Sequence, residues 1–322
     1  MKRIASMLLV AAALAASPSL VTAQNYPTQA IRIIVPFPPG GLVDTLARLL
    51  SSELTTAFDQ RIVVDNRPGA GGSIGEGEVA RAAPDGYTLL MVLDSFATNP
   101  LVYKKLPYDP FKDLAPISLI AKAPMVAIAS LKFAPNTLAE LIAYAKANPG
   151  KVDFGSVGAG SASHLTSELF AKATGISMVH VPYKGGAPAQ IDLMAGRLHL
   201  FWGTSAYAYP MVQTGKVKVL GQTGAKRSAA FPDLPTATEQ GVRNFDALGW
   251  IGMLAPAGTP PAIIDRWQAE LVKAANKPLI AKRLNEQGFD VVVSKPDEFG
   301  KFVRAEHDKW AVLIREQNIS LE

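Results

Sequence analysis

The sequence contains no cysteine among its 322 residues. Disulfides, thiol nucleophiles and thiolate metal ligands are therefore all excluded. A chain without disulfides must draw its stability from a packed core, and 48% of the residues are hydrophobic. The absence of cysteine also removes the cysteine-dependent hydrolases and redox enzymes from consideration.

Charged residues and histidines are both scarce. Only 18% of the residues are charged, the formal net charge is +5, and no run of five or six basic residues occurs. Nucleic acid is therefore not an expected partner. The four histidines, His164, His180, His199 and His307, never fall at the spacings that metal sites favour. We expect neither a metal site nor a cofactor.

Long apolar runs are absent apart from one at the start of the chain. Lys2 and Arg3 precede an apolar stretch over residues 4–16, and the small residues of Val21-Thr22-Ala23 follow. The stretch is shorter than the about 20 residues that span a hydrocarbon core. The pattern predicts a secretory signal peptide over residues 1–23, cut after Ala23, and hence an exported protein.

The length of the chain and the alternation of its elements predict an α/β fold of two lobes. A chain of 322 residues exceeds what one ordinary core fills. Helical patterns alternate with short β-branched or apolar runs, which favours largely parallel sheets flanked by helices. The strand-like runs are residues 31–35, 62–64, 87–92, 126–128, 153–157, 178–181, 198–202, 217–220 and 250–254.

Several helices carry start and stop signals. Thr137 followed by Glu140 forms a capping box, Pro188 and Gly196 bracket another helix, and Thr259-Pro260 opens a third. The last helix follows Pro296, and its aromatic stripe is typical of core packing. No linker of low complexity occurs, so we expect the lobes to be joined by paired crossing strands.

Two motifs that suggest catalysis or nucleotide binding both fail. Around Ser156, the sequence Phe154-Gly155-Ser156-Val157-Gly158 has Phe154 where a nucleophile elbow requires its first glycine. The glycine-rich run at 69–75 has Ile74 where a dinucleotide-binding loop requires its last glycine. The sequence offers no nucleophile with a base and an orienting partner, so we do not expect an enzyme.

Three glycine- or serine-rich turns, at 39–41, 69–75 and 158–164, each follow a strand and precede a helix. The unpaired N–H groups and positive end of a helix bind carboxylate or phosphate without a basic side chain. For any one of these loops, an ordinary strand-to-helix turn explains the sequence as well as an anion site does. Three such loops in one chain favour anion binding. Asp44 is expected to be the N-cap or the first-turn acid of its own helix and not a ligand contact, and His164 to pack or hydrogen-bond near the third turn.

A collinear set of motifs resembles one known family, the Bug-type substrate-binding proteins of tripartite tricarboxylate transporters. The motifs cover essentially the whole chain after residue 23. They are Pro36-Phe37-Pro38-Pro39-Gly40-Gly41 with Asp44 and Ala47-Arg48, Val64-Asp65-Asn66-Arg67-Pro68-Gly69-Ala70-Gly71-Gly72, Asn99-Pro100, Leu106-Pro107-Tyr108-Asp109-Pro110, Val181-Pro182-Tyr183-Lys184-Gly185 with Pro188-Ala189 and Asp192-Leu193, Pro235-Thr236 with Glu239-Gln240-Gly241, and Ala255-Pro256-Ala257-Gly258-Thr259-Pro260.

The resemblance implies a periplasmic binding protein, a monomer of two lobes that close over a small carboxylate and deliver it to the membrane subunits of a transporter. It places residues 24–123 with 248–322 in the first lobe and 124–247 in the second. It assigns the carboxylate to the first strand-to-helix loop and to its counterpart in the second lobe. The implied contacts are Phe37, Gly40, Gly41, Gly158, Ala159 and Ser161, with Gly72, Ser73, Ser95, Ser156, His164, Thr204 and Ser205 as further candidates.

Two other functions and several ligands stay open at this point. A binding protein that reports its ligand to a membrane sensor has the same sequence features as one that serves transport. A secreted hydrolase that uses the binding fold requires a reactive serine and a base. The ligand is a di- or tricarboxylate, an amino acid or an aromatic acid, and the sequence does not choose among them.

Overall fold

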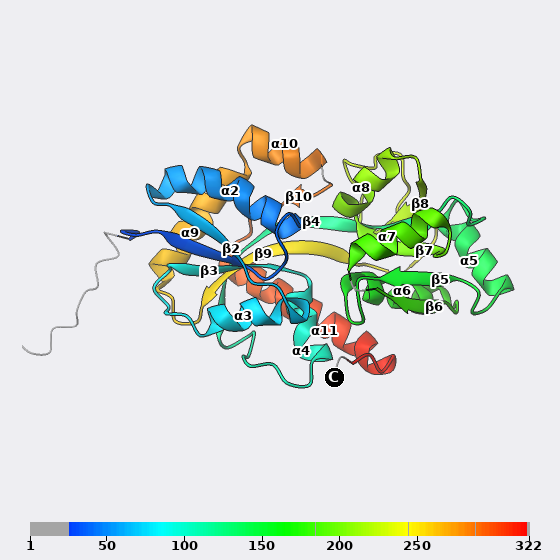
Figure 1. Ribbon diagram of the computed structural model, residues 1–322, viewed down its shortest axis with the longest axis horizontal. Coiled ribbons are helices and arrows are strands. Elements are labelled where there is room, and N and C mark those ends of the chain that lie inside the picture. Colours follow the sequence, from blue (N-terminus) through cyan, green and yellow to red (C-terminus); the bar gives the residue numbers. More distant parts are fainter. Residues whose placement is uncertain (1–25, 184, 244, 287, 321–322) are drawn as a thin grey trace, which may run out of the picture.

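Residues 26–320, apart from 184, 244 and 287, are described by the computed structural model, in which two lobes of α/β layers lie side by side (Figure 1). The predicted signal peptide at 1–23 lies outside the described residues. Within the described part of the chain, every helix is too short or too polar to cross a bilayer. The two-lobed α/β architecture confirms the fold expected from the sequence.

The first lobe is built on a mixed sheet in the order β2-β1-β3-β9-β4. Strands β1 (Ile31–Val35), β2 (Ile62–Asn66) and β3 (Thr88–Leu93) run parallel, whereas β9 (Leu248–Pro256) is antiparallel to β3 and to β4 (Leu114–Ser130). Both faces of the sheet are covered: Ile31 and Ile33 enter one apolar core, and Ile34 enters another. This explains why the first strand is apolar at nearly every position.

Helices cover both faces of this first sheet (Figure 1). One face packs against α2 (Leu42–Phe58), α9 (Pro261–Ala275) and α10 (Pro278–Glu286). The other face packs against α3 (Ser73–Ala80), α4 (Ser95–Val102) and α11 (Pro296–Glu316), and a short 3₁₀ turn, η2 (Ala70–Gly72), precedes α3. The buried side chains of α11 confirm that its aromatic stripe is core packing.

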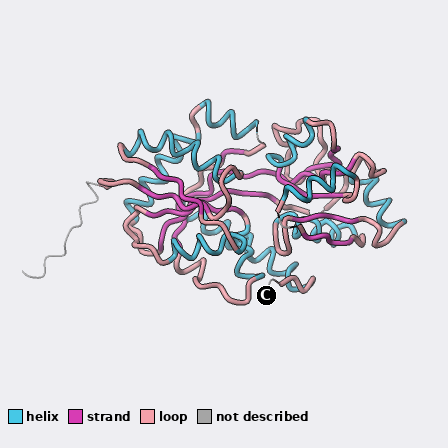
Figure 2. Tube along the Cα trace, in the orientation of Figure 1, coloured by secondary structure: helices cyan, strands magenta, loops and turns pink. Residues whose placement is uncertain are grey.

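The second lobe repeats the plan with a smaller sheet. The end of β4 pairs with β7 (Leu200–Thr204) and with β8 (Val217–Gln222), while β7, β5 (Asp153–Ser156) and β6 (Val179–Pro182) run parallel. The helices of this lobe are α5 (Leu138–Ala147), α6 (Ala162–Thr174), α7 (Gly186–Ala195) and α8 (Ser205–Gln213). In Figure 2 the strands occupy the middle of each lobe and the helices lie outside them.

Two paired strands connect the lobes. β4 and β9 are antiparallel neighbours, and Lys122 lies opposite Trp250 where they pass from one lobe to the other. α11 also reaches both lobes, because Trp310, Leu313 and Ile314 at its end enter the core of the second lobe. The sequence had suggested paired crossing strands in place of a flexible tether, and the structure has them.

The sequence located most strands but underestimated β4. The predicted run at 126–128 is only the end of a strand that begins at Leu114. Pro116 and Pro124 interrupt the β-branched pattern, and the register of the β4–β9 pair shifts between Pro116 and Ser118. A long strand with prolines at its irregular positions is difficult to recognise from local pattern. The two-residue strand β10 (Asp290–Val291) was also not predicted.

Candidate functional site

A cavity of about 1120 Å³ is lined by residues of both lobes. Its wall is formed where strands β1, β3, β5 and β7 end and helices begin, which is where open α/β sheets place their ligand sites. Its principal lining residues are Phe37, Gly40, Gly41, Leu42, Thr45, Gly71, Asp94, Ser95, Asn99, Tyr103, Gly158, Ala159, Ser161, Gly185, Gln190, Phe201, Trp202, Thr204, Tyr207 and Tyr209.

Asp44 stabilises the turn at residues 39–41, between β1 and α2. Its carboxylate accepts a hydrogen bond from the N–H of Gly40 at 2.9 Å and forms an ion pair with Arg48. Burial alone would raise the pKa of Asp44, but the hydrogen bonds from Arg48 and Gly40 outweigh burial and lower it. Asp44 is 2% exposed. Asp44 is the acid in the first turn of α2, one of its two expected roles, whereas the N-cap is Gly41; Asp44 is not among the lining residues of the cavity.

The free donors of this loop lie just beyond the double glycine. The N–H of Gly40 is used by Asp44, and that of Gly41 approaches the carbonyl of Pro38 at 3.4 Å. Helix α2 has Gly41 as its N-cap and no capping side chain, and no described residue accepts from the N–H groups of Leu42 or Val43. These two groups start the helix and carry its positive end.

The corresponding loop of the second lobe is fixed by its own side chains. Ser161 caps α6 by accepting from the N–H of His164, and the Nδ1 atom of His164 accepts from the N–H of Gly160 at 3.0 Å. The N–H groups of Ala159 and Ala162 have no acceptor among the described residues. The cavity therefore has unpaired backbone donors from both lobes, and His164 packs beneath the turn as expected.

Ser156 does approach a histidine, although no nucleophile motif surrounds it. Its Oγ lies 2.6 Å from Nε2 of His180, whose ring stacks on that of His164 with centroids 3.8 Å apart. Burial and the neighbouring His164 lower the pKa of His180 to about 4. Ser156 is fully buried and does not line the cavity. A serine without access to a ligand cannot act as a nucleophile on it.

The structure brings most of the predicted site residues together. Those that line the cavity are Phe37, Gly40, Gly41, Ser95, Gly158, Ala159, Ser161 and Thr204. The remaining five are not among its lining residues: Gly72, Ser73, Ser156, His164 and Ser205. Three of these act within the fold, because Ser156 and His164 hold the 156–164 loop and Ser205 donates to the carbonyl of Gly288 at 2.8 Å.

Asp94 was not predicted as a site residue, but it lines the cavity at the N-cap position of α4. Burial is the main cause that raises its pKa to about 7, and the nearby carboxylate of Glu306 adds to the effect. Asp94 lies two residues after the predicted strand at 87–92, directly after the observed end of β3, and precedes the predicted Ser95. Its position at the end of a strand is the one signal in the sequence that could have identified it.

Asn99 is a second lining residue that was missed, and it rests on a buried acid. Its amide donates to the carbonyl of Gly71 and, at 3.1 Å, to Oε2 of Glu76, which also accepts from the hydroxyl of Tyr108. The other oxygen of Glu76 has no described partner. Because Glu76 is fully buried, its pKa is raised to about 7. The hydrogen bonds of Glu76 and Tyr108 thus fix the position of Asn99 in the wall of the cavity.

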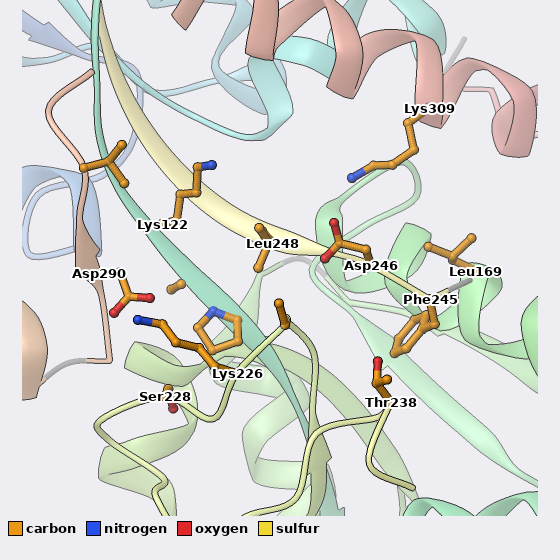
Figure 3. A pocket seen from close by; sticks show the side chains of 15 residues that line it. Lys122, Leu169, Lys226, Ser228, Thr238, Phe245, Asp246, Leu248, Asp290 and Lys309 are labelled. Carbon is orange, nitrogen blue, oxygen red and sulfur yellow. The ribbon is translucent and has the colours of Figure 1, made fainter. Parts of the chain in front are cut away.

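A second cavity of about 720 Å³ lies beside the crossing strands and shares no lining residue with the first (Figure 3). Basic side chains gather here, since Lys122, Lys226 and Lys309 line it together with Asp246 and Asp290. Lys309 pairs with Glu306, and Lys122 lies over the ring of Phe302. Two of the three lysines, Lys122 and Lys309, therefore already interact with neighbouring side chains of the fold.

This chain is similar along most of its length to one family of transporter receptors. A family model described as "Tripartite tricarboxylate transporter family receptor" matches residues 46–319. The protein BugT of Bordetella pertussis is 35% identical over 324 residues, which cover 100% of this chain and 99% of BugT.

Two solved structures with bound ligands are similar along most of their length. R. palustris Rpa4515 with adipate has a TM-score of 0.84 and 33% identity, covering 92% of this chain and 99% of that one. MatC of Rhodopseudomonas palustris with bound malate has a TM-score of 0.76 and 30% identity, covering 90% of this chain and 100% of that one.

Proposed function

We propose a function from one premise: the chain belongs to the family of tripartite tricarboxylate transporter receptors. It is a solute-binding protein of the Bug type. Our proposal is that it captures a small carboxylate in the periplasm and delivers it to the membrane subunits of a tripartite tricarboxylate-type transporter. It acts as a monomer, with residues 24–123 and 248–322 as one lobe and 124–247 as the other.

The observation that carries this proposal is the pair of helix starts that line one cavity from opposite lobes. The unpaired N–H groups of Leu42 and Val43 belong to the first lobe, and that of Ala162 to the second. Backbone donors at helix starts bind an anion without a basic side chain. None of the lining residues in the described part of the chain is Lys, Arg or His, so backbone N–H groups and neutral donors such as the Ser161 hydroxyl are the available partners for a carboxylate.

Two other functions are less well supported. Members of this family and the similar structures are binding proteins, and the buried Ser156 gives a hydrolase no accessible nucleophile. A binding protein that signals to a membrane sensor uses the same cavity and the same closed form. Loss of uptake of the ligand in cells that lack this protein supports transport, whereas unchanged uptake favours the sensor.

A thermal-shift screen of the purified protein without residues 1–23 tests the binding proposal. Adipate and malate are the first probes, followed by amino acids and aromatic acids. A ligand at one hundred times its Kd stabilises a protein by about 2.7 kcal/mol, which shifts the melting temperature measurably. If no carboxylate in the panel raises the melting temperature, the proposed function is wrong.

Two variants then test whether the backbone of the first loop holds the carboxylate. Gly41 has φ −73°, which a valine adopts, and a Cβ there would lie 3.3 Å from the carbonyl oxygen of Pro38. Gly41→Val therefore covers the start of α2, and the carbonyl of Pro38 must shift by a few tenths of an ångström to accept it. Because a hydrogen bond to a charged group contributes about 1.5 to 3 kcal/mol, loss of two weakens binding by about a thousandfold or more.

Ser161→Ala is the milder variant, and we expect roughly a tenfold to hundredfold loss in affinity from one hydroxyl. Thr137→Ala is its matched control, because Thr137 caps α5 in the same way but does not line the cavity. Circular dichroism verifies that each variant folds. Unchanged affinity in folded Gly41→Val would show that the carboxylate binds elsewhere.

The proposed location has its own measurement. Cleavage after Ala23 makes Gln24 the first residue of the exported protein. N-terminal sequencing of protein from a periplasmic extract gives the answer directly. A chain that begins at Met1, or one that stays with the membranes after a salt wash, contradicts the signal peptide.

A further inference from the structure

The charge of the large cavity is unusual for a site that holds an anion. Among its described lining residues the only formally charged ones are acids, Asp94 and Glu286. Glu286 is exposed at the end of α10, and its Oε1 atom lies 3.8 Å from Nζ of Lys282. Among the described residues Asp94 forms no ion pair, and the hydrogen bonds to its carboxylate come from the backbone N–H groups of Ser95 and Trp250. Asp94 is thus a lining acid that has no ion-pair partner among the described residues, and the nearby Lys309 is the cation that lowers its pKa.

Asp94 lies where the two lobes meet. It occupies the N-cap position of α4 at the end of β3, in the first lobe, without a side-chain cap hydrogen bond, while the side chain of Thr204 caps α8 in the second. A methyl group placed on the Cα of Gly249, in the crossing strand β9, would lie 3.5 Å from Oδ2 of Asp94 and 2.4 Å from Cγ2 of Thr204. The carboxylate therefore sits near the crossing strand, close to a residue of the opposite lobe.

A partly buried carboxylate in this position needs a partner. Removal from water penalises its charged form, and the pKa of Asp94 is accordingly raised to about 7, with burial as the main cause. Glu306 raises the pKa further, whereas Lys309 and the N–H groups of Ser95 and Trp250 lower it. The amino group of Lys309 is itself paired with Glu306. A ligand cation would satisfy Asp94 on closure of the lobes.

We infer that Asp94 binds a positively charged nitrogen of the ligand, so that the ligand is a carboxylate that also carries an amino group. This inference rests on the proposed function, because the carboxylate of the same ligand occupies the helix starts at α2 and α6. The ligand is then a zwitterion with its negative end on backbone N–H groups and its positive end on Asp94.

The same arrangement disfavours a plain dicarboxylate. A second negative group that reached Asp94 would meet a like charge at a carboxylate already removed from much of its water, and one of the two groups would have to take up a proton. The solved relatives are described with adipate and with malate. This chain therefore differs from them in the preferred ligand while keeping their fold.

Matched probes that share a carboxylate and differ by one amino group test the inference. The pairs are γ-aminobutyrate with butyrate, δ-aminovalerate with valerate, ε-aminocaproate with caproate, and glutamate with glutarate; adipate and malate complete the panel. Affinities are measured by titration calorimetry on the purified protein without residues 1–23. We expect at least one amino-bearing acid to bind at least tenfold more tightly than its matched acid.

Asp94→Asn keeps the shape of the side chain and removes its charge. The variant should lose at least tenfold in affinity for the amino-bearing acid and gain affinity for the matched acid or for adipate. Asp246→Asn is the control, since it removes a negative charge near the crossing strands but lines only the second cavity (Figure 3). Its affinities should equal those of the unmodified protein.

The possible outcomes distinguish failure of the Asp94 inference from failure of the proposed binding function. If acids bind but the amino group and Asp94→Asn make no difference, the inference is wrong and the proposed function stands. If Asp94→Asn does not fold, the panel on the unmodified protein decides alone, because equal binding within every pair refutes the inference. If no acid of either kind binds, the proposed function fails and the inference fails with it.

Discussion

Replacing Glu76 by glutamine should change how stability depends on pH. Glu76 is fully buried in α3 and its pKa is raised from 4.5 to about 7, chiefly because burial disfavours its charged form. Below pH 4.5 the group is neutral in both the folded and the unfolded chain, so its full contribution to stability is present there. As pH rises toward and through 7, the unfolded chain ionises first and that contribution is lost.

The size of the effect follows from the two pKa values. Each unit of difference corresponds to about 1.4 kcal/mol, and most of the difference develops in the accessible range. We therefore expect the free energy of unfolding of Glu76→Gln, relative to the unmodified protein, to rise by roughly 2 kcal/mol between about pH 5.5 and about pH 8.5. Glutamine keeps the acceptor for Asn99 and Tyr108 and carries no charge at any pH.

Urea unfolding of both proteins at a series of pH values measures this difference directly. Glu286→Gln, at an exposed glutamate, is the control for loss of one negative charge. A difference between Glu76→Gln and the unmodified protein that stays constant with pH would refute the reasoning. It would mean that Glu76 ionises in the folded protein as readily as in water, supported by its hydrogen bonds.

Three other predictions concern packing, capping and motion. Gly252→Ala should destabilise the fold by about 1 to 3 kcal/mol in urea unfolding, because a Cβ there would lie 2.1 Å from the buried ring of Phe299; equal stability would show that the ring moves freely. Thr137→Ala should cost about 1 kcal/mol, since Thr137 accepts from the N–H of Glu140, and an unchanged unfolding midpoint would contradict this. Solution scattering should show a smaller radius of gyration with a bound acid, whereas an unchanged value would argue for a site that is already closed.

Much of the fold was predictable because local signals agreed with the tertiary structure. The predicted helix after Thr259-Pro260 is α9, which begins at Pro261, and the helix bracketed by Pro188 and Gly196 is α7, with Gly196 in the left-handed conformation at its end. Caps and breakers act within one turn, so sequence alone reveals them. The length of β4 was not predictable, because its pairing with β9 overrides the prolines that interrupt its pattern.

The parts of the site that consist of backbone N–H groups could be predicted from glycine turns. The roles of side chains that depend on burial in the folded protein could not be predicted. Glycine turns such as Gly40-Gly41 indicate helix starts, and both residues line the cavity. Ser156 and Ser205 look like ligand hydroxyls in the sequence, but each is buried and bonded within the fold. Asp94 reads as an ordinary helix cap, and only the surroundings supplied by distant Glu306 and Trp250 make it distinctive.

The place of β9 in the sheet has a consequence for how the chain folds. β9 lies between β3 and β4, so that Leu90 pairs with Leu254, although most of the second lobe separates them in sequence. In contrast, β5, β6 and β7 pair within residues 153–204. Non-local pairing slows folding, so the β5, β6 and β7 strands of the second lobe can pair early while the sheet of the first lobe waits for β9. Until then β3 presents an open edge, the kind of surface that aggregates unless a chaperone covers it.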